Sequence, residues 1–160
     1  MRAMRREDHR MLREEAEALL RRAQVLRLGL VDEGGPYVVP LNFGYEDGRI
    51  YLHGAPEGRR MDAIARDPRV CFEVDEGEIV RGERPCGYTS RFSSVVGYGR
   101  ARVLETKEEK LRGLQALMRH YGGPVDGIDP AVLEKTAVVE IAIEQMDGKR
   151  HDVVRGLGGQ

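Results

Sequence analysis

Apolar side chains recur every three or four residues in two stretches of the chain, a spacing that places them on one face of a helix. The first stretch predicts a helix that begins near Asp8 and ends before Val25, with an apolar face of Leu12, Ala16, Leu19, Leu20 and Ala23. The second follows Thr106, which forms a capping box with Glu109, and ends at the Gly-Gly-Pro of 122–124. Both helices should lie against an apolar surface.

Alternation of apolar and polar positions predicts strands between the helices. A hairpin is expected from two runs joined by the Asp-Glu-Gly-Gly turn, and a tight turn at Asp47-Gly48 leads to the next strand. Six strands result, at 25–31, 36–45, 49–54, 69–75, 93–105 and 136–146. Short helices are expected around Met61 and Ile64, and after Asp129.

Residues 76–92 have no period and contain turn formers, so they predict a long loop of the kind that is often functional. In the strand that follows, Gly97 and Gly99 share a face, which favours a sharp bend or the close approach of another backbone. Six mainly antiparallel strands with peripheral helices predict a mainly β fold and a small barrel, because closure removes exposed sheet edges. One domain over 1–160 is expected, with frayed ends at 1–7 and 155–160.

Charge and composition limit which classes of partner, compartment and site the chain can have. The 26 basic and 27 acidic residues leave a formal net charge of -1, so no global field favours nucleic acid or a membrane surface. No apolar run is long enough to cross a bilayer and the amino terminus is too charged for a signal peptide, which predicts a cytoplasmic protein. Cys71 and Cys86 are read as free thiols, and the scattered histidines predict no metal site.

Arg59 and Arg60 stand where a loop becomes a helix. A helix start already carries free N–H groups and the positive end of the dipole, so two cations there favour an anionic ligand. The alternative is that both side chains bend into water, as most exposed arginines do.

The order "LGLVDEGGPYVVPLNFGYEDGRIYLHGAPEGRRMDAIARDPRVCFEVDE" followed by "SSVVGYGRARVLE" resembles the FMN-binding split-barrel proteins related to pyridoxamine 5'-phosphate oxidase. More narrowly, it is similar to the branch with the nitroimidazole-resistance proteins. The resemblance runs from about Leu12 to Gln145, and its most specific part is the ordered set H-G-A, G-R-R and D-P-R-V. It implies a six-stranded antiparallel split β-barrel with peripheral helices, and a homodimer with FMN at its interface.

The resemblance also implies site residues. The basic pair of the G-R-R motif would hold the FMN phosphate, a neighbouring strand would run along the flavin ring, the H-G-A stretch would lie beside it, and two serines would reach the cofactor. In this order the matching residues are Gly58, Arg59 and Arg60, then Pro40, Leu41 and Asn42, then His53, Gly54 and Ala55, then Ser93 and Ser94. Leu41 can equally be a core residue, and the serines can equally solvate a strand end.

His53 is the candidate catalytic residue. Alternation places it on the strand face of Arg49 and Tyr51, opposite Ile50 and Leu52, so it points away from the barrel core. There it could donate a proton to an acceptor bound near the flavin. The alternative is a neutral histidine that is hydrogen-bonded within the barrel rim.

Two classes of function follow. The first is an FMN-dependent oxidoreductase for a small planar acceptor, with nitroaromatic compounds as one candidate; the second is a protein that sequesters flavin or haem without turnover. No G-x-G-x-x-G fingerprint is present, so a nicotinamide electron donor would bind only transiently. The chain has no tryptophan and no carboxy-terminal arginine and tryptophan segment like that of pyridoxamine 5'-phosphate oxidases, which argues against vitamin B6 oxidation.

Overall fold

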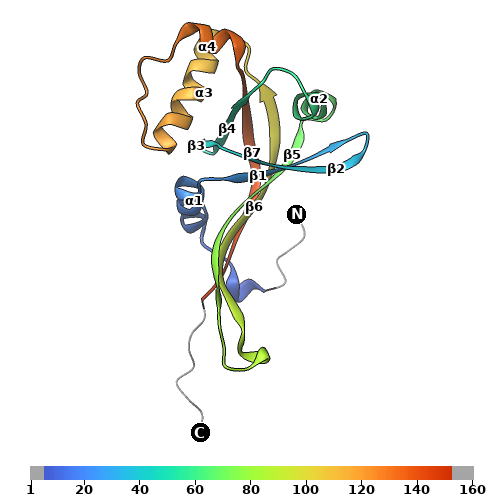
Figure 1. The fold of residues 1–160 in the computed structure, drawn as a ribbon, viewed down its shortest axis with the longest axis vertical. Coiled ribbons are helices and arrows are strands. Elements are labelled where there is room, and N and C mark those ends of the chain that lie inside the picture. Colours follow the sequence, from blue (N-terminus) through green and yellow to red (C-terminus); the bar gives the residue numbers. More distant parts are fainter. Residues whose placement is uncertain (1–5, 153–160) are drawn as a thin grey trace.

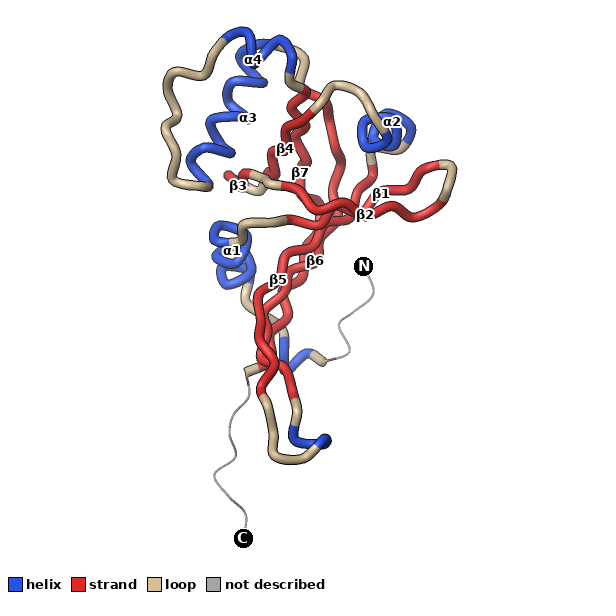
Figure 2. Tube along the Cα trace, viewed as in Figure 1, coloured by secondary structure: helices blue, strands red, loops and turns tan. Residues whose placement is uncertain are grey.

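The computed structural model describes residues 6–152, so the predicted frayed ends lie outside the described residues apart from Arg6 and Glu7. Strands dominate, and helices flank them (Figures 1 and 2). The helices are α1 (Arg13–Arg22), α2 (Arg59–Arg66), α3 (Lys107–His120) and α4 (Pro130–Lys135), with short 3-10 helices η1 (Glu7–His9) and η2 (Pro85–Gly87). The strands are β1 (Leu26–Asp32), β2 (Gly35–Leu41), β3 (Gly44–Glu46), β4 (Arg49–Gly54), β5 (Arg69–Val80), β6 (Thr89–Val103) and β7 (Ala137–His151).

All seven strands form one antiparallel sheet in the order β2-β1-β5-β6-β7-β4-β3. The strands at the two ends of this order, β2 and β3, are joined in the chain by Asn42 and Phe43. The sheet therefore curls on itself as a split barrel, which confirms the predicted fold class.

The apolar core lies inside the curl. Phe43, Ile50, Leu52 and Phe72 are fully buried there, and α1 adds its apolar face. A smaller cluster, with Leu104, Leu114 and Val138 among its residues, lies between α3, α4 and the outer face of β4 and β7. No helix of residues 6–152 is long and apolar enough to cross a bilayer.

The structure has seven strands where the sequence predicted six, because the run over 36–45 is broken. The backbone N–H of Phe43 donates to the Tyr121 hydroxyl at 3.0 Å, and the side-chain Nδ2 of Asn42 donates to the same oxygen at 3.4 Å. Tyr121 donates in turn to the Gln24 carbonyl at 2.7 Å. These bonds to the end of α3 replace ladder bonds, so β2 and β3 separate at Asn42.

The prediction of a loop over 76–92 was wrong. β5 continues to Val80 and β6 begins at Thr89, so only the turn between them lacks regular strand structure. Figure 1 shows the far ends of these strands extending from the barrel as an arm. Residues 75–79 are all exposed, so no alternation of apolar and polar positions marks this part of the strand.

The first helix begins later than predicted. Leu12, expected on its buried face, is the N-cap residue and is 71% exposed. Met11 is buried instead, and its N–H donates to the Gly148 carbonyl at 2.9 Å, which ties the chain to β7 before the helix starts. The buried face of α1 is Ala16, Leu19 and Leu20, as expected.

Gly97 and Gly99 confirm the expected bend and close approach. The register of β6 against β7 shifts between Tyr98 and Gly99. A Cβ at Gly99 would overlap the Ala142 carbonyl oxygen, and one at Gly97 would overlap the Phe72 ring. Both glycines thus serve packing within this chain.

Candidate functional site

The two arginines of the G-R-R motif open α2. Gly58 is the N-cap residue with φ +112°, a region that favours glycine, and its carbonyl accepts from the N–H groups of Met61 and Asp62. Ala63 and Ile64 are buried, so they anchor the helix to the barrel. The first turn therefore stays at the rim, with Arg59 and Arg60 held in fixed directions.

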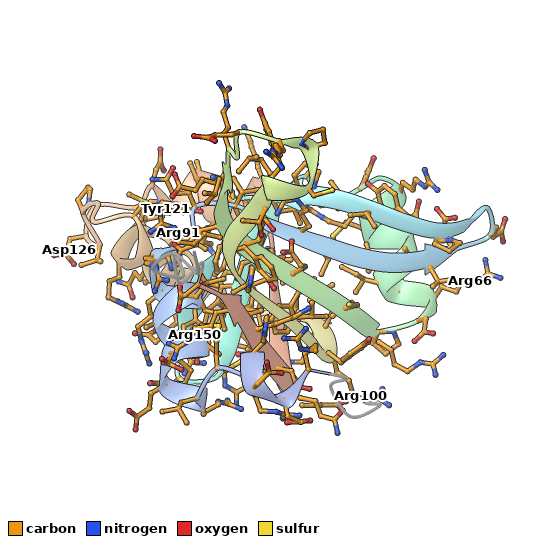
Figure 3. All side chains as sticks on the ribbon, turned by 90° about the horizontal axis from the view of Figure 1, so that it is seen from below. Arg66, Arg91, Arg100, Tyr121, Asp126 and Arg150 are labelled. Carbon is orange, nitrogen blue, oxygen red and sulfur yellow. The ribbon has the colours of Figure 1, made fainter. Side chains whose placement is uncertain are left out.

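Arg59 is already paired. Its Nε donates to Asp32 at the end of β1, and its guanidinium lies 4.2 Å from the centre of the Tyr37 ring on β2. The hydrogen bond from Arg59 lowers the pKa of the Asp32 carboxyl against the opposing effect of burial. In the last turn of α2, Arg66 pairs with Glu33 at 3.2 Å, close to the tip of the β1–β2 hairpin (Figure 3). The hairpin and α2 are thus joined by charge.

Arg60 is placed differently. Its guanidinium packs against Gly54 so closely that a Cβ at this glycine would overlap it. The Arg60 Nε is buried and has no hydrogen-bond acceptor among residues 6–152. A buried guanidinium N–H without an acceptor costs free energy, so this atom favours an oxygen ligand from outside the chain.

Pro40 and Leu41 belong to β2, an edge strand that pairs only with β1 in the described sheet. Its outer backbone groups are therefore available to a ligand, and proline is tolerated in such a strand. Leu41 follows Tyr37 by four residues, about 13 Å along the strand. An elongated ligand that starts at Arg59 can therefore follow this edge towards Asn42.

His53 is exposed and lies opposite the buried Leu52 in the alternation of β4, as predicted. Its ring makes no hydrogen bond to any residue that the structure describes, so the alternative of a hydrogen-bonded rim histidine has no partner here. Gly54 and Ala55 follow at the end of the strand. The stretch lies directly beside Arg60, because Gly54 contacts its guanidinium.

Ser93 and Ser94 lie elsewhere. They pair with Glu76 and Asp75 where the β5–β6 arm leaves the barrel. Figures 1 and 2 place this part of β6 well away from α2. Within one chain the structure therefore brings together Arg59, Arg60, Gly54 and the edge of β2, but not the two serines.

The pyridoxamine 5'-phosphate oxidase family model matches residues 12–150, nearly the whole chain. The chain belongs to the pyridoxamine 5'-phosphate oxidase family. A proposed 5-nitroimidazole antibiotic resistance protein from Bacteroides thetaiotaomicron VPI-5482 shares 30% identity and a TM-score of 0.79, and the match covers 88% of this chain and 86% of that one. An FAD-binding protein from Mesorhizobium loti is 26% identical with a TM-score of 0.66, over 89% of this chain and 97% of its own.

A curated relative of this family member is an uncharacterised protein of Rhizobium meliloti (strain 1021). It is 25% identical over 85 residues, which make up 53% of this chain and 56% of that protein. The chain thus matches little more than half of that relative's length.

Two neighbours of the G-R-R motif in this family member were not predicted from sequence. Asp32 and Tyr37 flank Arg59, but the first was interpreted only as a turn residue and the second only as a strand residue. An acidic residue at a hairpin end often pairs with a cation. The sequence does not indicate which arginine is the partner, because Asp32 and Arg59 are 27 residues apart in the chain.

Proposed function

We propose that the protein binds FMN at the start of α2 and is a flavin-dependent oxidoreductase for a small planar acceptor, with nitroaromatic compounds as a candidate class. The observation that carries this proposal is the buried Arg60 Nε, which has no acceptor within the described residues and lies against Gly54. Membership of the family, the likeness to a proposed nitroimidazole-resistance protein and the likeness to an FAD-binding protein support it.

The residues present fit a flavin phosphate. Arg60 offers an unpaired donor, and the first N–H groups of α2 add further donors together with the positive end of the helix dipole. Gly54 has no Cβ, which leaves room for the Arg60 guanidinium to lie against the end of β4. Arg59 can turn to the phosphate only by exchanging its bond to Asp32. We therefore assign Arg60 the larger contribution to phosphate binding.

Bound FMN would supply hydride or single-electron transfer at its ring. The chain's part is to orient the ring along the edge of β2 at Pro40, Leu41 and Asn42, and to place His53 at the acceptor side. The exposed His53 ring donates a proton to the reduced acceptor. A nicotinamide is the proposed electron donor.

A homodimer completes the site in this proposal. Ser93 and Ser94 lie too far along β6 to reach a ligand held by Arg60 of the same chain, so they would contact the cofactor of a second copy. A cavity of about 520 Å³, lined by Tyr37, Val38, Cys71 and Tyr98 among others, leaves apolar surface open beside β2. Burial of this surface by the second copy would stabilise the pair.

The absorbance spectrum of the freshly purified protein tests the proposal. Flavin bands are expected, and chromatography of the heat-released cofactor should identify FMN, because a site built for a terminal phosphate would give an adenylate no dedicated contacts. A Soret band would instead support haem sequestration, and released FAD would contradict the choice of FMN. Reduction by a nicotinamide, followed by reoxidation with a nitroaromatic compound, separates an oxidoreductase from a storage protein.

A further inference from the structure

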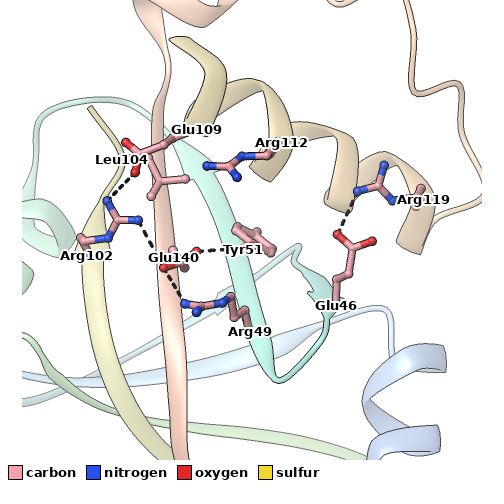
Figure 4. A pocket seen from close by; sticks show the side chains of 9 residues that line it. All are labelled: Glu46, Arg49, Tyr51, Arg102, Leu104, Glu109, Arg112, Arg119 and Glu140. Carbon is pink, nitrogen blue, oxygen red and sulfur yellow. Dashed lines mark hydrogen bonds and ion pairs between the residues drawn. The ribbon is translucent and has the colours of Figure 1, made fainter. Parts of the chain in front are cut away.

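A second cavity lies between α3 and the outer face of β4, β7 and β6 (Figure 4). Its volume is about 310 Å³, at the lower end of the range for small-molecule sites. It shares no residue with the set assigned to the flavin. The described residues that line it include four arginines and three glutamates, which leaves a formal surplus of one positive charge.

The Glu140 carboxylate forms the floor of this cavity, and its oxygens are hydrogen-bonded within the chain. Glu140 on β7 has a side chain only 14% exposed, and it accepts hydrogen bonds from Arg49 at 2.9 Å and from the Tyr51 hydroxyl at 3.3 Å. Arg102 approaches it at 3.4 Å and donates a shorter bond, 2.8 Å, to Glu109. The floor therefore has no negative charge left unpaired and its arginines are held in place.

The walls differ in how their charges are paired. Arg119 pairs with Glu46 at 2.9 Å near the end of α3. Arg112, from the middle of the same helix, extends its guanidinium over the cavity (Figure 4), and no hydrogen bond or ion pair joins it to any residue in the described part of the chain. The surplus positive charge thus resides on Arg112.

We propose that this cavity binds a small organic monocarboxylate, with Arg112 as its main anchor. A guanidinium offers two parallel N–H donors that match the two oxygens of a carboxylate. The single negative charge of a monocarboxylate balances the surplus positive charge of the cavity. A dianion would add a charge beside Glu109 and Glu140. The half-buried ring of Tyr51 supplies an apolar surface for the body of the ligand.

Calorimetric titration of the full-length protein with benzoate tests this proposal. Benzoate should bind the wild-type protein, and Arg112→Gln should weaken binding about ten- to a hundred-fold, the range of a charge-assisted bidentate bond. Arg81→Gln, an exposed arginine on the β5–β6 turn, is the matched control and should leave the affinity unchanged. Flavin content should be the same in all three proteins, which separates this site from that of Arg60.

Three results would overturn the proposal. The first is no benzoate binding by the wild-type protein up to about 10 mM, below which even weak specific sites begin to fill. The second is equal binding by the Arg112→Gln variant, which would place the anion elsewhere. The third is displacement of benzoate by inorganic phosphate with higher affinity, which would contradict the preference for a single negative charge.

Discussion

The guanidinium of Arg60 occupies the space that a side chain at Gly54 would need. The end of β4 and the start of α2 are therefore fitted to each other, and the glycine of the H-G-A stretch and the second arginine of the G-R-R motif act as one unit. The buried Arg60 Nε has no acceptor in residues 6–152, so this fit leaves one guanidinium donor unpaired.

Gly54→Ala should displace Arg60 without unfolding the protein, because the end of a long side chain can move. We expect the dissociation constant for FMN to rise about ten-fold, which corresponds to the loss of one charge-assisted hydrogen bond. Flavin fluorescence quenching measures it. In the double variant with Arg60→Gln, Gly54→Ala should cause no further loss, since the two changes remove the same contact. Additive losses would show that Gly54 acts independently of Arg60.

Asp32→Asn should strengthen FMN binding. The Asp32 carboxylate holds Arg59 in the described structure and competes with a phosphate for it. We expect a gain of about two- to five-fold, the scale of an exposed ion pair. Glu33→Gln is the matched control, because its partner Arg66 lies at the other end of α2. Weaker binding by Asp32→Asn would mean that Asp32 orients Arg59 towards the ligand.

His53→Gln should keep the fold and the flavin content but slow reduction of the acceptor by about ten- to a thousand-fold, the effect of losing a proton donor. The rate must be expressed per bound flavin. A variant that loses flavin, and whose bound fraction reacts at the wild-type rate, would make His53 a cofactor contact and remove its catalytic assignment.

Val38→Glu should break the proposed homodimer. Val38 is 64% exposed beside the apolar cavity of β2, and a buried unpaired carboxylate there would oppose association. Sedimentation velocity should show a monomer with reduced flavin content, whereas Val132→Glu on α4 should remain dimeric. A wild-type monomer that retains FMN would contradict a shared site.

Where burial alternates, the sequence predicts this fold well. β1, β4, α2 and α3 appear where their apolar periods place them, because one face of each contacts the core. The arm was missed because both faces of β5 beyond Val74 are exposed, so no period remains in that stretch. The break at Asn42 depends on the Tyr121 hydroxyl, a contact across 79 residues that no local pattern contains.

For the candidate site too, the sequence predicts local features but not contacts between distant segments. The positions of Arg59 and Arg60 at a helix start follow from local signals, and so does the outward direction of His53. That Arg59 is held by Asp32 while Arg60 is left without an acceptor follows only from how the β1–β2 hairpin meets α2. The sequence also does not show that Ser93 lies at the β5–β6 arm, at a distance from these two arginines.

The most direct test of the central claim compares FMN with riboflavin, which lacks only the phosphate. Both flavins are titrated into wild-type apoprotein and into the double variant Arg59→Ala, Arg60→Ala. The wild-type protein should prefer FMN by at least about ten-fold, and the double variant should bind both flavins with the same, weaker affinity. Equal affinities in the wild-type protein, or a preference for FMN that survives in the variant, would contradict a phosphate site at the start of α2.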